Sequence, residues 1–317
     1  MIHFLRLIRF TNLFIIVATL YSIAAYLDVL FGQTAREWEV VSSASFFYLA
    51  LSTVFIAAAG NVINDYYDVE IDQVNRPEKV VVGRFISKQN TLRLYGLVNF
   101  FGALFMLLFV IQTHFYFGFV IAFFWIVMLW LYSSKFKKSF LMGNLIVALC
   151  IGIVPLLVGL YFQHHYKGIP LMETYPFSFS KTSFFSIKIG VGFGIFAFLS
   201  NVLREMIKDM EDVEGDQRLQ ARTIPIVLGQ KKARNLGLSL WAGILVFLVV
   251  FFVFTHDFIL DLSAFWPLLL SVVFLIYSGF VLTKATTKKN LHKVSLGLKL
   301  SMFFSLILPL YWLFKLM

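Results

Sequence analysis

The chain has 317 residues, of which 60% are hydrophobic and only 14% are charged. A water-soluble domain cannot bury so large an apolar fraction, so this composition excludes a soluble enzyme and predicts an all-α protein embedded in lipid. The formal net charge is +10, but the basic residues gather in loops on one predicted side of a membrane, which argues against a nucleic-acid-binding protein.

Apolar runs long enough to cross a bilayer as helices occur nine times along the chain. A helix needs about 20 residues to cross about 30 Å of hydrocarbon. The first run follows Arg6 and Arg9 and shows no cleavage-type boundary, so we expect an uncleaved span rather than a signal peptide. The predicted fold is therefore a polytopic membrane protein with nine transmembrane helices. The nine runs lie near residues 12–32, 41–63, 92–112, 115–132, 140–162, 184–207, 236–255, 265–283 and 294–316.

The distribution of basic residues predicts the orientation of these spans. Basic loops stay on the cytoplasmic side of a membrane. We therefore expect an integral protein of the cell (inner) membrane with a cytoplasmic N-terminus and an external C-terminus. Most of the 27 Lys and Arg residues fall at the N-terminus and in the loops near 64–91, 133–139, 204–235 and 284–293.

An acidic octet occurs twice, each time at the predicted cytoplasmic end of a span. It reads DYYDVEID at 65–72 and DMEDVEGD at 209–216, with five of eight positions identical at a constant offset of 144 residues. Such a repeat indicates two related halves. We predict one domain over residues 1–317, made of one four-helix half (about 1–139), a second (about 140–293) and a ninth helix (about 294–316).

The spacing within each octet places three carboxylates on one face of a helix that continues beyond the membrane. Like charges at this spacing repel one another, and Mg²⁺, which prefers oxygen ligands, would offset that repulsion. A substrate with phosphates bridged by Mg²⁺ explains so many aspartates better than a lone ion does. Gly215 predicts an early end to the second helix, which would put Asp216 on a loop. The candidate metal ligands are Asp65, Asp68, Asp72, Asp209, Asp212 and Asp216.

Basic and polar side chains near the octets are candidates for holding a diphosphate, because Arg and Lys bind phosphate oxygens strongly. The alternatives are ordinary loop charge for the basic residues and an interfacial position for Tyr132. Asn144 is polar within a span and must face the bundle interior. The candidate substrate-binding residues at this stage are Arg9, Asn12, Arg76, Tyr132, Lys135, Lys137, Asn144 and Arg222.

Four motifs carry a resemblance to a known family. They are NDYYDVEID at 64–72, NRP at 75–77, REMIKDMEDVEGD at 204–216 and RTIPIVLG at 222–229. With them the chain resembles the UbiA-type intramembrane prenyltransferases over essentially its whole length. The resemblance implies a ring of nine helices around a central cavity, with both aspartate motifs at its cytoplasmic mouth. It adds Asn64 to the substrate-binding residues and implies four catalytic aspartates, Asp68, Asp72, Asp212 and Asp216.

The resemblance implies Mg²⁺-dependent transfer of a polyprenyl group, expected to be geranylgeranyl, from its diphosphate to a lipophilic acceptor. The compact NDYYDVEIDQVNRP most resembles the branch that alkylates geranylgeranylglyceryl phosphate in ether-lipid synthesis. The following EKVVVGRFIS departs from the usual RPxRPIPSGxIS, which leaves open an aromatic acceptor of quinone synthesis such as 4-hydroxybenzoate. A divalent-cation transporter and a noncatalytic isoprenoid-binding scaffold are the rival hypotheses. A conducting path needs polar groups near the middle of several spans, which disfavours the transporter.

Overall fold

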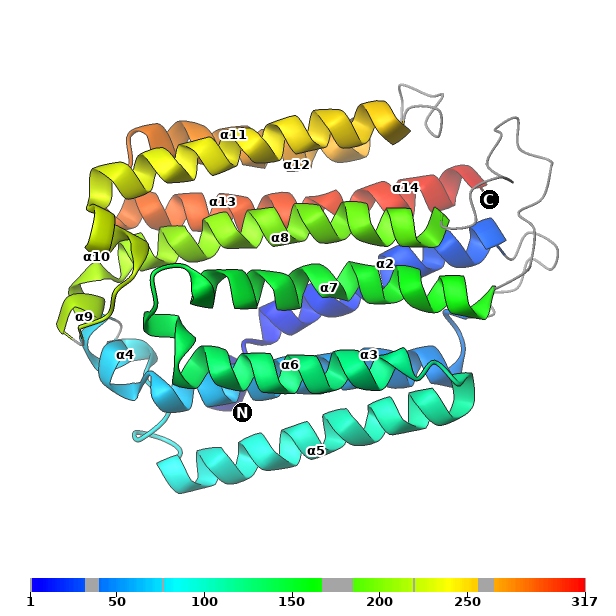
Figure 1. The fold of residues 1–317 in the computed structure, drawn as a ribbon, viewed down its shortest axis with the longest axis horizontal. Helices are drawn as coiled ribbons and strands as arrows, with labels where there is room; N and C mark the ends of the chain where they lie inside the picture. Colours follow the sequence, from blue (N-terminus) through cyan, green and yellow to red (C-terminus); the bar gives the residue numbers. More distant parts are fainter. Residues whose placement is uncertain are drawn as a thin grey trace. The chain divides into compact units, whose positions relative to one another are not determined.

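The structure of the chain, a computed structural model, is helical throughout the part it describes (Figure 1). A single isolated bridge, between Val82 and Ile86, is the only β pairing in that part. The prediction of an all-α protein is therefore confirmed. The described residues are 2–31, 40–75, 77–166, 185–218, 220–255 and 265–316.

A helix covers each of the nine predicted spans within the described residues. Eight helical segments there are long and apolar enough to cross a membrane, and one further helix contains a shorter apolar stretch, Leu268–Thr283. The chain is thus a polytopic integral membrane protein. The long helices are α2 (Phe10–Phe31), α3 (Ala44–Tyr67), α5 (Lys88–Thr113), α6 (Phe117–Ser134), α7 (Met142–His165), α8 (Phe185–Glu211), α11 (Gln230–Thr255), α12 (Phe265–Thr283) and α13 (Lys288–Ser305) with α14 (Ile307–Leu316).

Short helices lie beside the spans, and two of them occupy the octets, where the sequence predicted continuations of the long helices. They arise beside the spans rather than inside them, because their sequences are too polar or too short to cross the bilayer. Those on which the candidate site depends are α4 and α9, which carry the ends of the two octets. The short elements are α1 (Ile2–Leu7), α4 (Val69–Asn75), η1 (Pro77–Lys79), η2 (Phe136–Lys138), α9 (Val213–Arg218) and α10 (Ile224–Leu228).

The last span is interrupted at Leu306, between α13 and α14. Pro309 has no N–H with which to donate to the carbonyl of Ser305 four residues earlier. The N–H of Leu306 bonds the carbonyls of Phe303 and Phe304, which are closer along the chain than the carbonyl four residues earlier that an α-helix would use. The single predicted ninth helix is therefore two helices in sequence.

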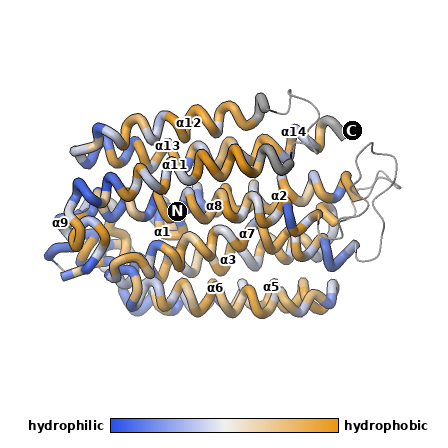
Figure 2. Tube along the Cα trace, turned by 45° about the horizontal axis from the view of Figure 1, so that its top comes forward, coloured by the Kyte–Doolittle hydropathy of each residue, from blue (hydrophilic) through white to orange (hydrophobic). Residues whose placement is uncertain are grey.

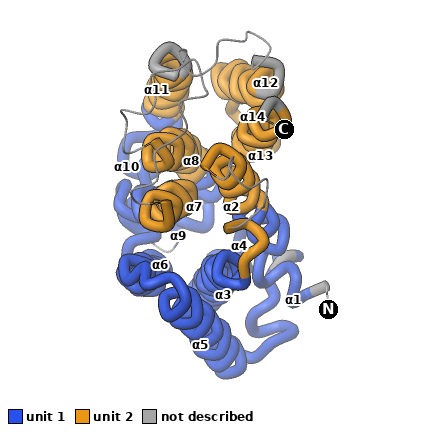
Figure 3. Tube along the Cα trace, turned by 90° about the vertical axis from the view of Figure 1, so that its right-hand side faces the viewer, with its two compact units in different colours: residues 1–17, 44–150, 208–233 blue, residues 18–43, 151–207, 234–317 orange. Residues whose placement is uncertain are grey.

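The chain forms two compact units, each assembled from separate stretches (Figure 3). Both aspartate octets belong to unit 1, although 144 residues separate them along the sequence. The division into a half at about 1–139, a half at about 140–293 and a ninth helix stays a prediction. Unit 1 contains residues 1–17, 44–150 and 208–233, and unit 2 contains residues 18–43, 151–207 and 234–317.

In unit 1, α3 packs against both α5 and α6 (Figure 1). The Ser52 hydroxyl on α3 donates to the carbonyl of Gly102 on α5 at 2.7 Å, an interhelical bond of the kind that joins helices in lipid. Ser87 caps the start of α5 by accepting from the Asn90 N–H. Figure 2 shows these three helices as mainly hydrophobic and the region around α9 as hydrophilic.

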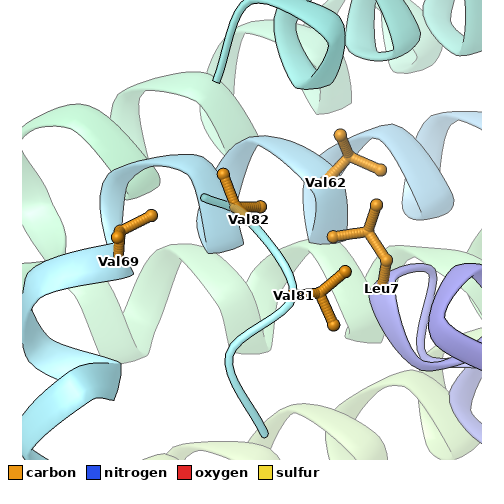
Figure 4. Close-up of a cluster of buried hydrophobic side chains, with 5 residues drawn as sticks. All are labelled: Leu7, Val62, Val69, Val81 and Val82. Atoms are coloured by element: carbon orange, nitrogen blue, oxygen red, sulfur yellow. The ribbon is translucent and has the colours of Figure 1, made fainter. Parts of the chain in front are cut away.

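A cluster of buried aliphatic side chains holds α4 against the end of α3 (Figure 4). It combines Leu7 from α1, Val62 from α3 and Val69 from α4 with Val81 and Val82 from the segment after η1. Because these residues come from four places in the sequence, burying them fixes the direction in which the chain leaves the span. The first octet, which contains Val69, is thereby anchored in a buried hydrophobic cluster.

In unit 2, a buried carboxylate organises the end of α2. Asp28 accepts from the backbone N–H groups of Val40 and Val41, at 3.1 and 3.0 Å, and from the hydroxyl of Tyr166 at 3.0 Å. A charge inside a membrane span is costly unless it is paired in this way. These bonds tie α2 to the segment before α3 and to the end of α7.

Candidate functional site

Both octets begin on a long helix and end on a short one. The first is broken at Asp68, between α3 and α4, and the second at the equivalent Asp212, between α8 and α9. The backbone N–H of Asp68 still bonds the Asn64 carbonyl at 3.0 Å, and that of Asp72 bonds the Asp68 carbonyl at 2.8 Å. The predicted unbroken helices are therefore wrong in detail, although helical bonding continues across the break.

The predicted early helix end at Gly215 is also wrong. Gly215 and Asp216 both lie within α9, so Asp216 is on a helix rather than a loop. The break comes earlier, at Asp212. Glu70 and Glu214 have exposed side chains, whereas Asp68 and Asp216 of the same octets are buried.

Lys137 lies at the centre of the polar contacts. Its ammonium donates to the carboxylate of Asp68 and, at 3.5 Å, to the side-chain oxygen of Asn64. Asn64 in turn donates to Asp68 at 2.6 Å. Burial disfavours the charge on Lys137, but the charge and hydrogen bond of Asp68 together with Tyr132 outweigh burial and raise the pKa of the lysine.

The carboxyl groups at the two octet ends have similar environments. Burial raises the pKa of Asp72 to about 6, with a further contribution from Asp68. Burial likewise raises the pKa of Asp216 to about 6, helped by Asp212 and Asp68 and opposed by Lys137. Asp68 and Lys137 thus act on carboxyls of both octets, so the two acidic segments of unit 1 share one electrostatic site.

The first aspartate of each octet is held by a predicted site residue. Arg9 donates to Asp65 at 3.1 Å from the turn between α1 and α2, where it adopts the left-handed φ of 52°. Asn144 near the start of α7 donates to Asp209 at 2.8 Å. Asn144 is buried, which confirms that it faces the interior.

The remaining predicted residues differ in exposure. Lys135 and Arg222 have exposed side chains, although the Arg222 backbone N–H bonds the Lys138 carbonyl at 2.8 Å and so ties η2 to the segment after α9. Asn12 and Tyr132 are half-buried, and Tyr132 interacts electrostatically with Lys137. Arg76 lies outside the described residues.

Two residues to which sequence reasoning gave no role also reach the site. Thr223 is buried, and its hydroxyl donates to the Asp216 carboxylate at 3.4 Å. Asn75 at the end of α4 bonds the backbone at Asp212 and Gly215. Each lies within one of the four motifs, Asn75 in NRP and Thr223 in RTIPIVLG, and that membership was the sequence signal.

The donor set suits Mg²⁺ that is shared with a substrate. In the part of the chain that the structure describes, no three His, Cys, Asp or Glu side chains are placed to hold a metal ion by themselves. Mg²⁺ characteristically keeps waters and binds through one or two carboxylates together with substrate phosphates. Buried carboxylates such as Asp68 and Asp216 fit that mode, in which phosphate oxygens complete the coordination.

Comparison with known sequences identifies the family. The profile of the UbiA prenyltransferase family matches residues 12–307. The chain belongs to the UbiA prenyltransferase family. The resemblance expected from the four motifs is thereby confirmed, as is the expectation of a prenyltransferase.

Relatives with a named activity cover most of this UbiA protein. It is 28% identical over 305 residues to a digeranylgeranylglyceryl phosphate synthase of Methanosphaera stadtmanae, covering 96% of each chain. It is 31% identical over 260 residues to the synthase of the same name from Thermococcus kodakarensis, covering 82% of each. The confirmed similarity therefore lies with the ether-lipid branch.

Solved structures share the fold of this UbiA protein. One, described as giving structural and mechanistic insights into digeranylgeranylglyceryl phosphate synthase in membranes, has a TM-score of 0.61 at 23% identity, with 99% of this chain and 98% of that chain covered. Another, a UbiA homologue from Archaeoglobus fulgidus bound to GPP and Mg²⁺, has a TM-score of 0.54 at 14% identity, with 97% and 99% covered. At these identities the likeness supports the fold alone.

Proposed function

We propose that this protein transfers a geranylgeranyl group from its diphosphate to geranylgeranylglyceryl phosphate, with Mg²⁺, in ether-lipid synthesis. The observation that carries the proposal is that the two acidic segments meet: Lys137 donates to Asp68 of the first, and Asn75 at the end of α4 bonds the backbone of the second at Asp212 and Gly215. The similarity to synthases of this name supports the choice of acceptor.

The proposed site binds the diphosphate between the two acidic segments. Bound Mg²⁺ supplies positive charge that stabilises the departing diphosphate. Lys137 adds a fixed positive charge beside Asp68, and Asn64 holds the Asp68 carboxylate in its orientation. Arg9 orients the carboxylate of Asp65 and Asn144 orients that of Asp209, the first aspartate of each octet.

The proposed reaction exchanges one carbon–oxygen bond for another. The bond between the first prenyl carbon and the diphosphate oxygen breaks, and the diphosphate leaves with the electron pair. The acceptor hydroxyl oxygen bonds to that carbon and gives up its proton to the departing diphosphate, so the products are the ether and protonated diphosphate. Apolar spans exclude water, which would otherwise capture the prenyl cation.

The proposed topology follows the sequence expectations. Nine spans surround a central cavity, the N-terminus and the acidic segments are cytoplasmic, and the C-terminus is external. The high content of Lys and Arg in the loops that carry the octets supports this orientation.

The decisive experiment is product identification. Purified protein in lipid nanodiscs is incubated with Mg²⁺, labelled geranylgeranyl diphosphate and, separately, geranylgeranylglyceryl phosphate, 4-hydroxybenzoate or dihydroxynaphthoate. We expect a product only with the glyceryl phosphate, with the mass of a second prenyl ether. A product with an aromatic acceptor alone would overturn the ether-lipid assignment. Cation flux in proteoliposomes without any prenyl transfer would support the transporter instead.

Gly143 provides a test of the position of Lys137. A Cβ at residue 143 would lie 2.7 Å from the carbonyl oxygen of Phe136 and 3.0 Å from the Cα of Lys137. We expect Gly143→Ala to push η2 away from Asp68 and lower kcat/KM for prenyl diphosphate about tenfold. Gly96→Ala is the matched control, because a Cβ there meets nothing within 4 Å. Equal kcat/KM values for the two variants would contradict the prediction.

A further inference from the structure

Asn75 connects the two acidic segments through the backbone rather than through their carboxylates. Its side-chain nitrogen donates to the carbonyl of Asp212 at 3.3 Å, and its side-chain oxygen accepts from the N–H of Gly215 at 3.0 Å. A single amide therefore bonds both Asp212, the residue between α8 and α9, and Gly215 in the first turn of α9. The partners lie 137 and 140 residues away along the chain.

Gly215 is complementary to this amide in shape. A Cβ at residue 215 would lie 2.7 Å from both the Cγ and the side-chain oxygen of Asn75, well inside van der Waals contact. Any other residue at position 215 would displace the amide. The close approach of α4 and α9 thus requires glycine on one helix and asparagine on the other.

The two octets differ at the positions that form this contact. At the offset of 144 residues, Gly215 corresponds to Ile71 and Asn75 corresponds to Leu219, whereas all three aspartates of each octet are unchanged. The shared residues serve the same chemistry in both copies. Asn75 and Gly215 make a contact that has no counterpart at the equivalent positions, because those positions hold Leu219 and Ile71.

Charge explains why the contact matters. The carboxylate of Asp68 on the first segment acts on Asp216 of the second with like charge, so the segments repel one another when no cation is bound. The two bonds of Asn75 are uncharged and reach the backbone, and they hold α9 beside α4 without using an oxygen that a cation or phosphate would need.

We propose that Asn75 and Gly215 form a brace that sets the separation of the two acidic segments, making Asn75 a positioning residue for metal and diphosphate binding. The inference rests on the proposed function for its kinetic consequence only. The two hydrogen bonds of the brace lie within unit 1 and do not depend on which reaction the protein catalyses.

The kinetic test uses Asn75→Ala and Gly215→Ala. Each variant should raise the KM for geranylgeranyl diphosphate and the Mg²⁺ concentration for half-maximal rate about tenfold, and leave the KM for the acceptor unchanged. Because both variants break the same contact, the double variant should be no worse than either single variant. Gln73→Ala is the matched control, since Gln73 is an exposed side chain on the same short helix.

A distance measurement tests the brace without catalysis. Cys150 is the only cysteine, so Cys150→Ser gives a background for spin labels at Gln73→Cys on α4 and Gln217→Cys on α9, both exposed positions. Pulsed EPR should show a narrow distance distribution with Asn75 present and a broader one in Asn75→Ala or Gly215→Ala.

The outcomes separate the two proposals. Unchanged distance distributions in both variants overturn the brace. Broadened distributions with unchanged Mg²⁺ dependence and unchanged KM overturn its positioning role. If the unsubstituted protein transfers no prenyl group, the proposed function fails, while the EPR result still decides the brace.

Discussion

Replacing Asp68 with asparagine should remove most prenyl transfer while leaving the protein folded. Asp68 is buried and accepts from both Asn64 and Lys137. Asparagine has nearly the same shape but no negative charge, so it binds neither Mg²⁺ nor the Lys137 ammonium as strongly. We expect kcat/KM for the prenyl diphosphate to fall about 10²–10³-fold, measured with labelled substrate in nanodiscs.

Glu70→Gln is the matched control for Asp68→Asn. Glu70 lies two residues along the same segment, on α4, but its side chain is exposed. Neutralising it should leave kcat/KM essentially unchanged, because an exposed carboxylate is screened by water. Full activity of Asp68→Asn, or equal losses in both variants, would refute the assignment of Asp68 to the site.

Removing the charge of Lys137 should have the second largest effect. Lys137→Ala leaves the Asp68 carboxylate without its cation and takes a positive charge away from the diphosphate position. We expect kcat/KM for the prenyl diphosphate to fall about 100-fold, mainly through a higher KM. The KM for the acceptor should not change, because Lys137 contacts the acidic residues of the diphosphate site.

Lys135→Ala separates this effect from a general loss of basic charge. Lys135 is two residues away in the same loop, and its side chain is exposed. The two variants remove the same charge, so any influence of the overall electric field on substrate capture is common to both. A loss in Lys135→Ala as large as that in Lys137→Ala would show that loop charge, rather than the contact with Asp68, matters.

The identity of the acceptor is inferred from sequence similarity, whereas the diphosphate site is inferred from the contacts in the structure. The acidic segments and Lys137 recognise the diphosphate, which every prenyl donor carries. They contain no information about an acceptor hydroxyl. Similarity to the synthases of Methanosphaera stadtmanae and Thermococcus kodakarensis supplies that part of the proposal, despite the unusual EKVVVGRFIS segment.

The amino-acid sequence by itself determined the fold class, the approximate positions of the apolar helices, and the paired acidic segments. These features are local, because a long apolar run must become a helix in lipid whatever its neighbours are. The octet repeat is equally visible, since its aspartates recur at one offset. Breaks such as those at Asp68 and Asp212 escaped prediction, because no proline or other strong helix breaker stands at either position.

Only the tertiary structure decided which polar groups meet. Lys137 and Asp68 are 69 residues apart, Asn144 and Asp209 are 65 apart, and Asn75 and Gly215 are 140 apart. From the sequence, Lys135 and Lys137 were equal candidates, because their loop has no regular periodicity that separates an inward from an outward side chain. The choice depends on how Gly143 lets η2 pack against α7, and such a contact exists only once distant segments have folded together.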